Sequence, residues 1–461
     1  MEFSTVAAVS TPPGKGGVAV LRISGSEALS IAERVFRAKS GKSLSDYPAR
    51  FQIYGSILSS DGIRVLDDGL LTYFAAPHSF TGEDVVEIAC HGGEMITSMV
   101  LSALLESGAT MASAGEFTRR AFMNGKLSLT AAEGVADLLD ARTEEAALLS
   151  SKTVRGRLSC EIERITARIL EAASSLWAYL DYPEDDLQSF DDDALVSLLS
   201  EVLRESEALL HSYRTGRAIS SGIPAVIAGK PNVGKSTLFN RLLGEDRAIV
   251  TSVPGTTRDV IEYPLKLGRV LLNLSDTAGV REDASDLVEE IGIEKAVRAV
   301  SEAEVIFFVL DRSREFSDDD KALLSAVLRR QEDALVIPVL NKCDLPSALD
   351  LCELPFEKDA YFSCGHDLLD IDELVRRVEE RFISDESALR EGRVITNARQ
   401  RSALICAISL LKEAIDQIRR GDKDVASLTL ESALAAFLEI DGKSAGEKIL
   451  NEVFSRFCVG K

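Results

Sequence analysis

The sequence has little of what an extracellular or membrane protein needs. Its seven cysteines are odd in number and scattered, with no Cys-x-x-Cys pair, so neither a disulfide framework nor a structural zinc site is predicted. No apolar run reaches the roughly 18 residues that a membrane span needs, and the N-terminus lacks a basic-then-apolar signal. We therefore expect a protein of the reducing cytoplasm with no membrane partner.

Basic residues are also scarce, 52 against 74 acidic ones, which gives a formal net charge of -22. Because affinity for phosphate backbones comes mainly from Lys and Arg, this balance disfavours sequence-independent nucleic-acid binding, and no DNA partner is predicted. An RNA substrate would need a local basic patch or a partner protein. The 461 residues, 46% of them hydrophobic, are enough for about three globular domains.

The pattern of apolar residues predicts a multidomain chain that combines α/β and all-α parts. Alternating strand-like and helix-like runs over residues 1–118 predict an α/β domain. Apolar residues at helical spacing over 119–221, and again over 381–461, predict one helical domain built from both stretches. Residues 222–380 are then an inserted compact domain.

Within this scheme the sequence indicates individual elements. In the first domain it predicts strands at 19–23, 51–58, 70–75 and 84–89, a capped helix at 26–36 and a helix at 94–106. Farther along, we expect a solvated acidic loop at 181–193 and a linker at 386–392.

The inserted domain carries a phosphate-binding motif. A short apolar run at 225–228 leads into residues 229–236, which read G-x-x-x-x-G-K-S, and a helical run follows up to Gly244. The glycines let backbone N–H groups surround phosphate oxygens at a helix N-terminus. Lys235 is expected to reach the β- and γ-phosphates and the Ser236 hydroxyl to bind Mg²⁺. The predicted contacts here are Asn232, Val233, Gly234, Lys235, Ser236 and Thr237.

Three further motifs follow in the order of a guanine-nucleotide site. A strand at 270–275 leads into Asp276, Thr277, Ala278 and Gly279, which are predicted to meet Mg²⁺ and the γ-phosphate. Another strand at 335–340 leads into Asn341, Lys342 and Asp344, and a carboxylate such as Asp344 can accept both the N1 and the exocyclic amino hydrogens of guanine. Ser363, Cys364 and Gly365 occupy the position of the base-lining loop. The sequence therefore predicts a Ras-like P-loop domain that binds GTP as its substrate.

Between the phosphate-binding motif and the strand at 270–275 lies a loop rich in Thr, Gly and Pro, of the kind that becomes ordered when a γ-phosphate is present. Thr257 is predicted to reach Mg²⁺, and a plain turn is the alternative. The predicted nucleotide contacts in this loop are Thr251, Ser252, Val253, Pro254, Gly255, Thr256 and Thr257.

Two catalytic groups of Ras-like GTPases have no counterpart. The position of the water-orienting glutamine is Val280, which cannot hydrogen-bond, and no arginine finger is evident. Glu282, Glu289 and Glu290 are candidates to orient the water. A cation could replace the arginine if oxygens gather near the phosphates, with Asn232 as one donor, although Asn232 could equally be a turn residue.

The other motifs resemble one family. They are residues 11–17 (Thr-Pro-Pro-Gly-Lys-Gly-Gly), 21–25 (Leu-Arg-Ile-Ser-Gly), 79–84 (Ser-Phe-Thr-Gly-Glu-Asp), 90–93 (Cys-His-Gly-Gly), 115–118 (Gly-Glu-Phe-Thr), 124–126 (Asn-Gly-Lys) and 457–461 (Phe-Cys-Val-Gly-Lys). With them the whole chain resembles the bacterial and organellar tRNA-modification GTPases of the MnmE (TrmE) family.

The resemblance implies an N-terminal domain that dimerises and binds 5,10-methylene- or 5-formyl-tetrahydrofolate, a discontinuous helical domain and an inserted GTPase domain. It also implies a homodimer that joins the flavoprotein MnmG in a heterotetramer. Together they place a carboxymethylaminomethyl or aminomethyl group on C5 of the wobble uridine of certain tRNAs. The resemblance further implies that K⁺ stimulates GTP hydrolysis and that hydrolysis brings the GTPase domains of two subunits together across the dimer.

Carried over by residue, the resemblance implies K⁺ ligands at Asn232, Thr256 and the carbonyls of Thr251 and Val253, Mg²⁺ ligands at Ser236 and Thr257, and folate contacts at Arg22, Glu87, Lys126 and Lys461. Glu289 aligns with the water-positioning glutamate, and one extra residue in the preceding loop leaves Glu290 as the alternative.

Some residues keep two interpretations. Cys458 becomes a thiol near the modification site in an unsettled role, because its C-terminal context fits a prenylation signal poorly, while Phe454 and Phe457 are predicted to pin the last helix to the core. His91 could be a base, but a buried structural histidine is favoured. Arg393, Arg399 and Arg401 either touch tRNA or face solvent, and Gln400 stands where the family is expected to have histidine.

A binding switch of the ribosome-assembly type, without covalent chemistry, is the alternative function. A basic RNA-binding tail would favour it, and this acidic chain shows none.

Overall fold

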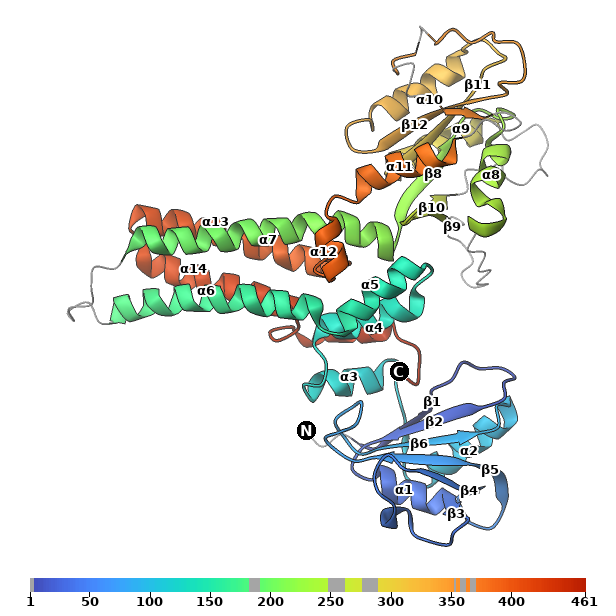
Figure 1. Cartoon of the computed structure of the whole chain (residues 1–461), viewed down its shortest axis with the longest axis vertical. Helices are drawn as coiled ribbons and strands as arrows, with labels where there is room; N and C mark the ends of the chain where they lie inside the picture. Colours follow the sequence, from blue (N-terminus) through green and yellow to red (C-terminus); the bar gives the residue numbers. More distant parts are fainter. Residues whose placement is uncertain are drawn as a thin grey trace. The chain divides into compact units, whose positions relative to one another are not determined.

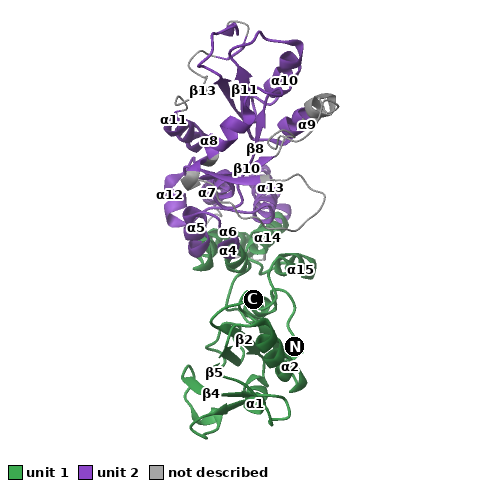
Figure 2. Cartoon of the chain, turned by 90° about the vertical axis from the view of Figure 1, so that its right-hand side faces the viewer, with its two compact units in different colours: residues 1–136, 153–181, 427–461 green, residues 137–152, 182–426 purple. Residues whose placement is uncertain are grey.

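The computed structural model describes residues 4–181, 191–247, 262–275, 289–351, 354–356, 362–364 and 370–461 (Figure 1). The chain divides into two compact units, residues 1–136, 153–181 and 427–461 in the first and residues 137–152 and 182–426 in the second (Figure 2). In the described part of the chain, no helix is both long and apolar enough to span a bilayer.

The described strands of the first unit form one sheet in the order β3-β4-β5-β6-β2-β1-β7, antiparallel throughout except for the parallel pair β1 and β7. They are β1 (Val6–Val9), β2 (Ala19–Ser24), β3 (Phe36–Ala38), β4 (Gln52–Leu58), β5 (Val65–Phe74), β6 (Val85–Cys90) and β7 (Thr110–Met111). Helices α1 (Ala28–Val35) and α2 (Glu94–Glu106) cover one face, where Leu21 and Ile88 are fully buried. Because side chains alternate along a strand, Arg22 and Glu87 lie on the opposite face.

The α/β expectation for this region is confirmed, and two elements differ in detail. The helix predicted at 94–106 is α2 with those bounds. The strand predicted at 70–75 begins earlier, at Val65. The predicted capped helix at 26–36 is shorter, and Glu27 stands at its N-cap without a side-chain hydrogen bond, so Ser26 does not cap it.

Helices from both ends of the sequence pack together in the first unit. The helices that lie at least partly in it are α3 (Glu116–Met123), α4 (Leu129–Asp140), α5 (Glu144–Val154), α6 (Arg157–Asp181), α14 (Lys423–Ile440) and α15 (Glu447–Ser455). The buried carboxylate of Asp441 accepts hydrogen bonds from the hydroxyls of Thr130 (2.6 Å) and Ser159 (2.9 Å). Asp441 follows Thr130 by 311 positions and Ser159 by 282 positions in the sequence, and the whole inserted domain lies between them. The helical part is therefore discontinuous in sequence.

The same joining of distant segments occurs in the second unit, where α7 (Asp192–Ser220) packs on α13 (Ala398–Arg420). A Cβ at Gly216 would lie 2.1 Å from the carbonyl oxygen of Ile395, so only glycine permits this approach. The predicted linker at 386–392 is wrong: it forms helix α12 (Glu386–Glu391), which Asp385 caps and which ends at Gly392 with a φ of 74°. The predicted acidic loop falls mostly on residues outside the described ones.

The inserted domain is built on a sheet whose described strands run in the order β13-β12-β11-β8-β10-β9, parallel except for the antiparallel pair β9 and β10. They are β8 (Ile223–Ala228), β9 (Glu262–Leu267), β10 (Val270–Ser275), β11 (Val305–Asp311), β12 (Leu335–Asn341) and β13 (Phe362–Cys364). Helices α8 (Lys235–Arg247) and α11 (Ile371–Phe382) pack on one face, and α9 (Glu289–Glu302) and α10 (Asp318–Leu328) on the other.

Every residue of β11 is buried, as expected for a central parallel strand covered on both faces. The carboxyl ends of the parallel strands meet at one edge, where ligands bind in such sheets. The predicted fold class, an N-terminal α/β domain with a discontinuous helical part and an inserted Ras-like GTPase fold, is confirmed.

Candidate functional site

The phosphate loop occupies the turn between β8 and α8. Asn232 and Gly234 both have positive φ angles, 62° and 93°, which lets the loop curl before the helix begins at Lys235. A positive φ is unfavourable for a residue other than glycine, although asparagine tolerates it better than most. The loop therefore ends at a helix N-terminus, where backbone N–H groups can meet phosphate oxygens.

Strand β12, which leads into the predicted guanine-binding residues, is hydrogen-bonded directly to this loop. Asn341, at the end of β12, is 5% exposed, and its Nδ2 donates to the carbonyl oxygen of Val233 at 2.7 Å. A Cβ on Gly234 would lie 1.8 Å from the same Nδ2, so a glycine is required for the contact. The amide thus fixes the phosphate loop and the start of the Asn341–Asp344 turn relative to each other.

Lys235 folds back on its own loop. Its ammonium donates to the carbonyl oxygens of Gly229 (2.9 Å) and Lys230 (2.8 Å), and burial lowers its pKa. Lys230 in turn reaches the cap of α10, where it contacts Ser317 and lies 3.4 Å from the Asp320 carboxylate. These contacts hold the loop between β8 and α8 on both sides.

Lys342 is positioned by a carboxylate that sequence reasoning missed. Its backbone has a φ of 59°, and its ammonium lies 2.6 Å from Asp311 at the end of β11. Burial raises the pKa of the Asp311 carboxyl, but hydrogen bonds from Lys342 and Ser313 outweigh it, so the net shift is downward. Asp344 is exposed on the same turn.

The other predicted nucleotide residues are placed in part. Ser236 and Thr237 are in the first turn of α8, and β13 sets Ser363 and Cys364 beside Leu340 and Asn341 in parallel register. Glu289 is the first residue of α9, followed by Glu290. The remaining predictions lie outside the described residues: Thr251, Ser252, Val253, Pro254, Gly255, Thr256, Thr257, Asp276, Thr277, Ala278, Gly279 and Gly365.

In the N-terminal domain, Arg22 and Glu87 are directly opposite each other on β2 and β6. Nε and a terminal nitrogen of the guanidinium both donate to Oε1 of Glu87, at 2.9 and 2.7 Å. The guanidinium carbon also lies 5.6 Å from the ring centroid of Phe80 and 5.5 Å from that of Phe117. Phe117 is fully buried and Phe80 is 40% exposed.

The chain's last residues lie against this group. The backbone N–H of Phe117 donates to the carbonyl oxygen of Lys461 at 3.1 Å, and Val459 pairs with Ala114 as an antiparallel bridge. Gly460 has a φ of 99°, and a Cβ there would lie 2.1 Å from the carbonyl oxygen of Val9. The tail is thereby seated on the N-terminal domain through backbone contacts.

The other two predicted residues near this group differ in their surroundings. Lys126 donates to the carbonyl oxygen of Pro77 at 2.9 Å, so it supports the loop that carries Phe80. Cys458 is exposed next to the bridge, whereas Phe454 and Phe457 are buried against α3 and α4 as predicted.

Two family models match the chain. The model described as GTP-binding protein TrmE N-terminus matches residues 5–126, and the model described as MnmE helical domain matches residues 129–458. Proteins named tRNA modification GTPase MnmE from Thermoanaerobacter sp. and Symbiobacterium thermophilum are 37% and 39% identical, each over 100% of both chains. The protein of that name from Acetivibrio thermocellus is 36% identical over 99% of both chains.

The chain belongs to the MnmE family.

Among solved structures, the G domain of the T. maritima FeoB iron transporter is 25% identical over 34% of this chain and 97% of its own, with a TM-score of 0.25.

Besides the linker at 386–392, the structure corrects a second expectation for this member of the MnmE family. His91 is not a buried structural histidine: its side chain is 76% exposed, and its Nδ1 lies 2.8 Å from Asp67. Burial raises the pKa of the Asp67 carboxyl, but hydrogen bonds from His91 outweigh it and the pKa is lowered. Burial, with Asp67 nearby, also raises the pKa of the neighbouring Cys90 thiol to about 11. No pattern in the sequence pointed to Asp67, because it lies 24 residues before His91.

The structure gives contacts for three residues near the start of α13 whose roles the sequence left open. Gln400 is fully buried and accepts a hydrogen bond from the backbone N–H of Thr396. The Arg401 guanidinium lies 5.3 Å from the Tyr213 ring centroid, and Arg393 pairs with Glu391 at 2.7 Å.

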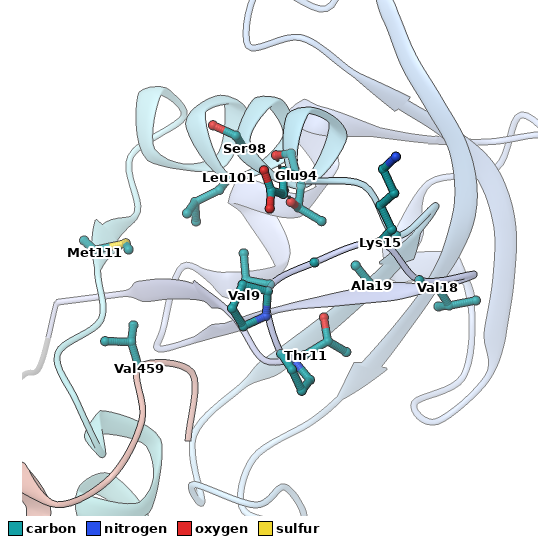
Figure 3. Close-up of a pocket in the computed structure, with 16 residues that line it drawn as sticks. Val9, Thr11, Lys15, Val18, Ala19, Glu94, Ser98, Leu101, Met111 and Val459 are labelled. Carbon is teal, nitrogen blue, oxygen red and sulfur yellow. Dashed lines mark hydrogen bonds between the residues drawn. The ribbon is translucent and has the colours of Figure 1, made fainter. Parts of the chain in front are cut away.

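The N-terminal domain also has a cavity of about 600 Å³ where three of its motifs meet (Figure 3). Lys15 comes from the loop before β2, Glu94 and Ser98 come from α2, and Val459 comes from the tail. The backbone N–H of Gly16 donates to the carbonyl oxygen of Gly92 at 2.9 Å, which ties the loop to the start of α2. None of the four predicted folate residues lines this cavity.

Proposed function

We propose that this member of the MnmE family, a GTP hydrolase, works with the flavoprotein MnmG to modify C5 of the wobble uridine of tRNA. The product is a carboxymethylaminomethyl or aminomethyl group, and a tetrahydrofolate supplies the one-carbon unit. Relatives that carry the name tRNA modification GTPase share 36–39% of their residues with this chain over essentially its whole length.

One observation carries the folate part of the proposal: the tail and the Arg22–Glu87 pair contact the same residue. Phe117 donates its backbone N–H to Lys461 and places its ring against the Arg22 guanidinium. The carboxylates of a folate can pair with basic side chains, and the N–H groups at the edge of its pterin ring can donate to a carboxylate. Arg22, Glu87 and Lys461 supply these groups.

The domain scheme follows the motifs. Residues 1–118 form the folate-binding and dimerising domain, 119–221 and 381–461 the helical domain, and 222–380 the GTPase domain. The protein acts as a homodimer in the cytoplasm and forms a heterotetramer with MnmG.

The phosphate loop has the donors that the expected cations need. Asn232, exposed at the turn, offers an amide oxygen, and Ser236 offers a hydroxyl at the start of α8. Hard cations prefer such oxygen ligands, so Asn232 fits K⁺ and Ser236 fits Mg²⁺. The other proposed ligands are Thr251, Val253 and Thr256 for K⁺ and Thr257 for Mg²⁺. When bound, the cations supply positive charge where an arginine finger acts in other GTPases.

The protein's own groups then divide the remaining work. Lys235 pairs with the phosphates, Asp344 accepts from the guanine edge, and Glu289 orients the attacking water. The Asn341 amide keeps the phosphate loop and the base loop in fixed relation, so both ends of the nucleotide are bound at once. Cys458 serves as a thiol near the modified base.

Binding of 5-formyl-tetrahydrofolate to the full-length chain tests the proposal. Isothermal titration should give saturable binding for the wild type, and Arg22→Ala should weaken it because the guanidinium is lost. Lys39→Ala is the matched control, since Lys39 pairs with Asp68 on another part of the same sheet. Absence of binding by the wild type would remove the folate-dependent function and favour a regulatory GTPase.

A further inference from the structure

The loop that precedes β6 presents one aromatic ring to solvent beside the Arg22–Glu87 pair. Phe80 is 40% exposed, while the second ring against the same guanidinium, Phe117, is fully buried. The contact with the Arg22 guanidinium accounts for the part of the ring that is covered, and 40% of Phe80 stays open to a further flat group. We propose that Phe80 is the stacking platform for the pterin ring, an inference that rests on the proposed folate site.

The loop holds Phe80 in a fixed place before any ligand arrives. Asn124 Nδ2 donates to the carbonyl oxygen of Thr81 at 2.8 Å, and Lys126 donates to Pro77 at 2.9 Å. Gly82 has a φ of 80°, with the side chains of Asn124 and Lys126 against the position of its missing Cβ. Both flanks of Phe80 are therefore anchored to the residues that follow α3.

A second set of contacts fixes the far end of the loop. Glu83 accepts from the Ser24 hydroxyl (2.7 Å) and from Arg120 (3.0 Å), which is 2% exposed and also donates to Glu116. Removing one partner of such a buried network is costly, so the loop resists displacement. A rigid aromatic wall loses little entropy when a flat ligand stacks on it.

The ion pair beside the ring keeps unused hydrogen-bonding groups. Both printed bonds from Arg22 end on Oε1 of Glu87, and within the described part of the chain no hydrogen bond involves Oε2. A guanidinium has five donors, so Arg22 retains some. Glu87 Oε2 can accept from a ring N–H or amino group while Arg22 donates to a neighbouring ring nitrogen or carbonyl, which matches the edge of a pterin.

In this arrangement Lys126 acts by positioning. Its ammonium supports the loop through Pro77, whereas Phe80 contacts the ligand. Phe80 therefore recognises the pterin together with Arg22 and Glu87, and Lys461 is left to pair with the carboxylates of the p-aminobenzoylglutamate portion.

Full-length protein and two ligands test the inference: 5-formyl-tetrahydrofolate and p-aminobenzoylglutamate, which lacks the pterin. Stacking of a base on an aromatic ring is worth roughly 1–3 kcal/mol, or about 5- to 150-fold in affinity. We expect Phe80→Ala and Phe80→Leu to weaken 5-formyl-tetrahydrofolate by a factor in this range, and Phe80→Trp to restore it. Affinity for p-aminobenzoylglutamate should not change in any of them.

Phe51→Ala is the control, because Phe51 is also exposed but stacks on Tyr47 at 5.7 Å in another part of the domain. If the wild type binds 5-formyl-tetrahydrofolate and Phe80→Leu binds it equally well, the platform is wrong and the folate site stands. Equal losses for both ligands would also overturn stacking. If the wild type binds neither ligand, the proposed function itself fails, and the inference with it.

Discussion

The amide of Asn341 is the contact whose removal should tell most about the nucleotide site. In Asn341→Ala the carbonyl oxygen of Val233 loses the donor that lies 2.7 Å away in a buried setting. Leaving a buried acceptor unsatisfied costs about 1–3 kcal/mol. Because this bond orders the phosphate loop, part of that cost should appear in nucleotide affinity and the rest in the free energy of unfolding.

At about 1.4 kcal/mol per factor of ten, the combined loss corresponds to about 5- to 150-fold. The affinities for GDP and for GTP should fall by factors equal to each other, because the loop surrounds phosphates that both nucleotides carry. Fluorescence titration with a labelled guanine nucleotide measures affinity, and guanidinium unfolding without nucleotide measures stability.

Asn273→Ala supplies the control, since the Asn273 amide makes the same kind of bond, to Ser221 at 3.0 Å, but in an exposed setting. We expect it to change neither quantity by more than about 1 kcal/mol. If Asn341→Ala and Asn273→Ala behave alike in both assays, the link between the phosphate loop and the base loop is not what organises the site.

Three further outcomes are expected. Replacing K⁺ by Na⁺, or Asn232→Ala, should slow GTP hydrolysis strongly with little change in nucleotide affinity; equal rates in both salts would refute the role of the cation. Glu289→Ala should bind GTP normally but lose turnover in a phosphate-release assay, and if Glu290→Ala does so instead, the other glutamate orients the water. At pH values above the ordinary aspartate pKa of about 3.9, the charged Asp311 carboxylate pairs with Lys342, so Asp311→Asn should lower the free energy of unfolding there. This difference from the wild type should vanish as the pH falls through the lowered pKa of Asp311. A difference that does not change between about pH 3 and 7 would exclude that ion pair as its source.

The sequence predicted those parts of the fold that local patterns determine. The phosphate loop is followed by α8 because glycines and a following helical run define such a turn without help from the rest of the chain. Helix α2 has the predicted bounds because its hydrophobic residues, including the buried Val100 and Leu104, recur at helical spacing. Residues 386–392 were predicted as a linker because their polar composition hides a short helix that depends on the Asp385 cap.

Contacts between distant strands could not be predicted from the sequence. Arg22 and Glu87 were named from the family resemblance, but the register of β2 and β6 makes them a pair. Asp311 and Asp67 were missed for the same reason, since each carboxylate meets its partner only after separate strands align. Phe80 was named only as part of the 79–84 motif, because the sequence does not show that an aromatic residue in a loop is exposed until its neighbours are placed.

We propose above all that GTP hydrolysis by this chain drives the transfer of a folate one-carbon unit to tRNA. The direct test supplies tetrahydrofolate labelled at the one-carbon position to the wild type and to Lys235→Ala, each with MnmG, tRNA, GTP, Mg²⁺ and K⁺. We predict label on the wobble uridine with the wild type and none above background with Lys235→Ala. Equal labelling by both proteins, or no label from folate with an active wild type, would contradict the claim.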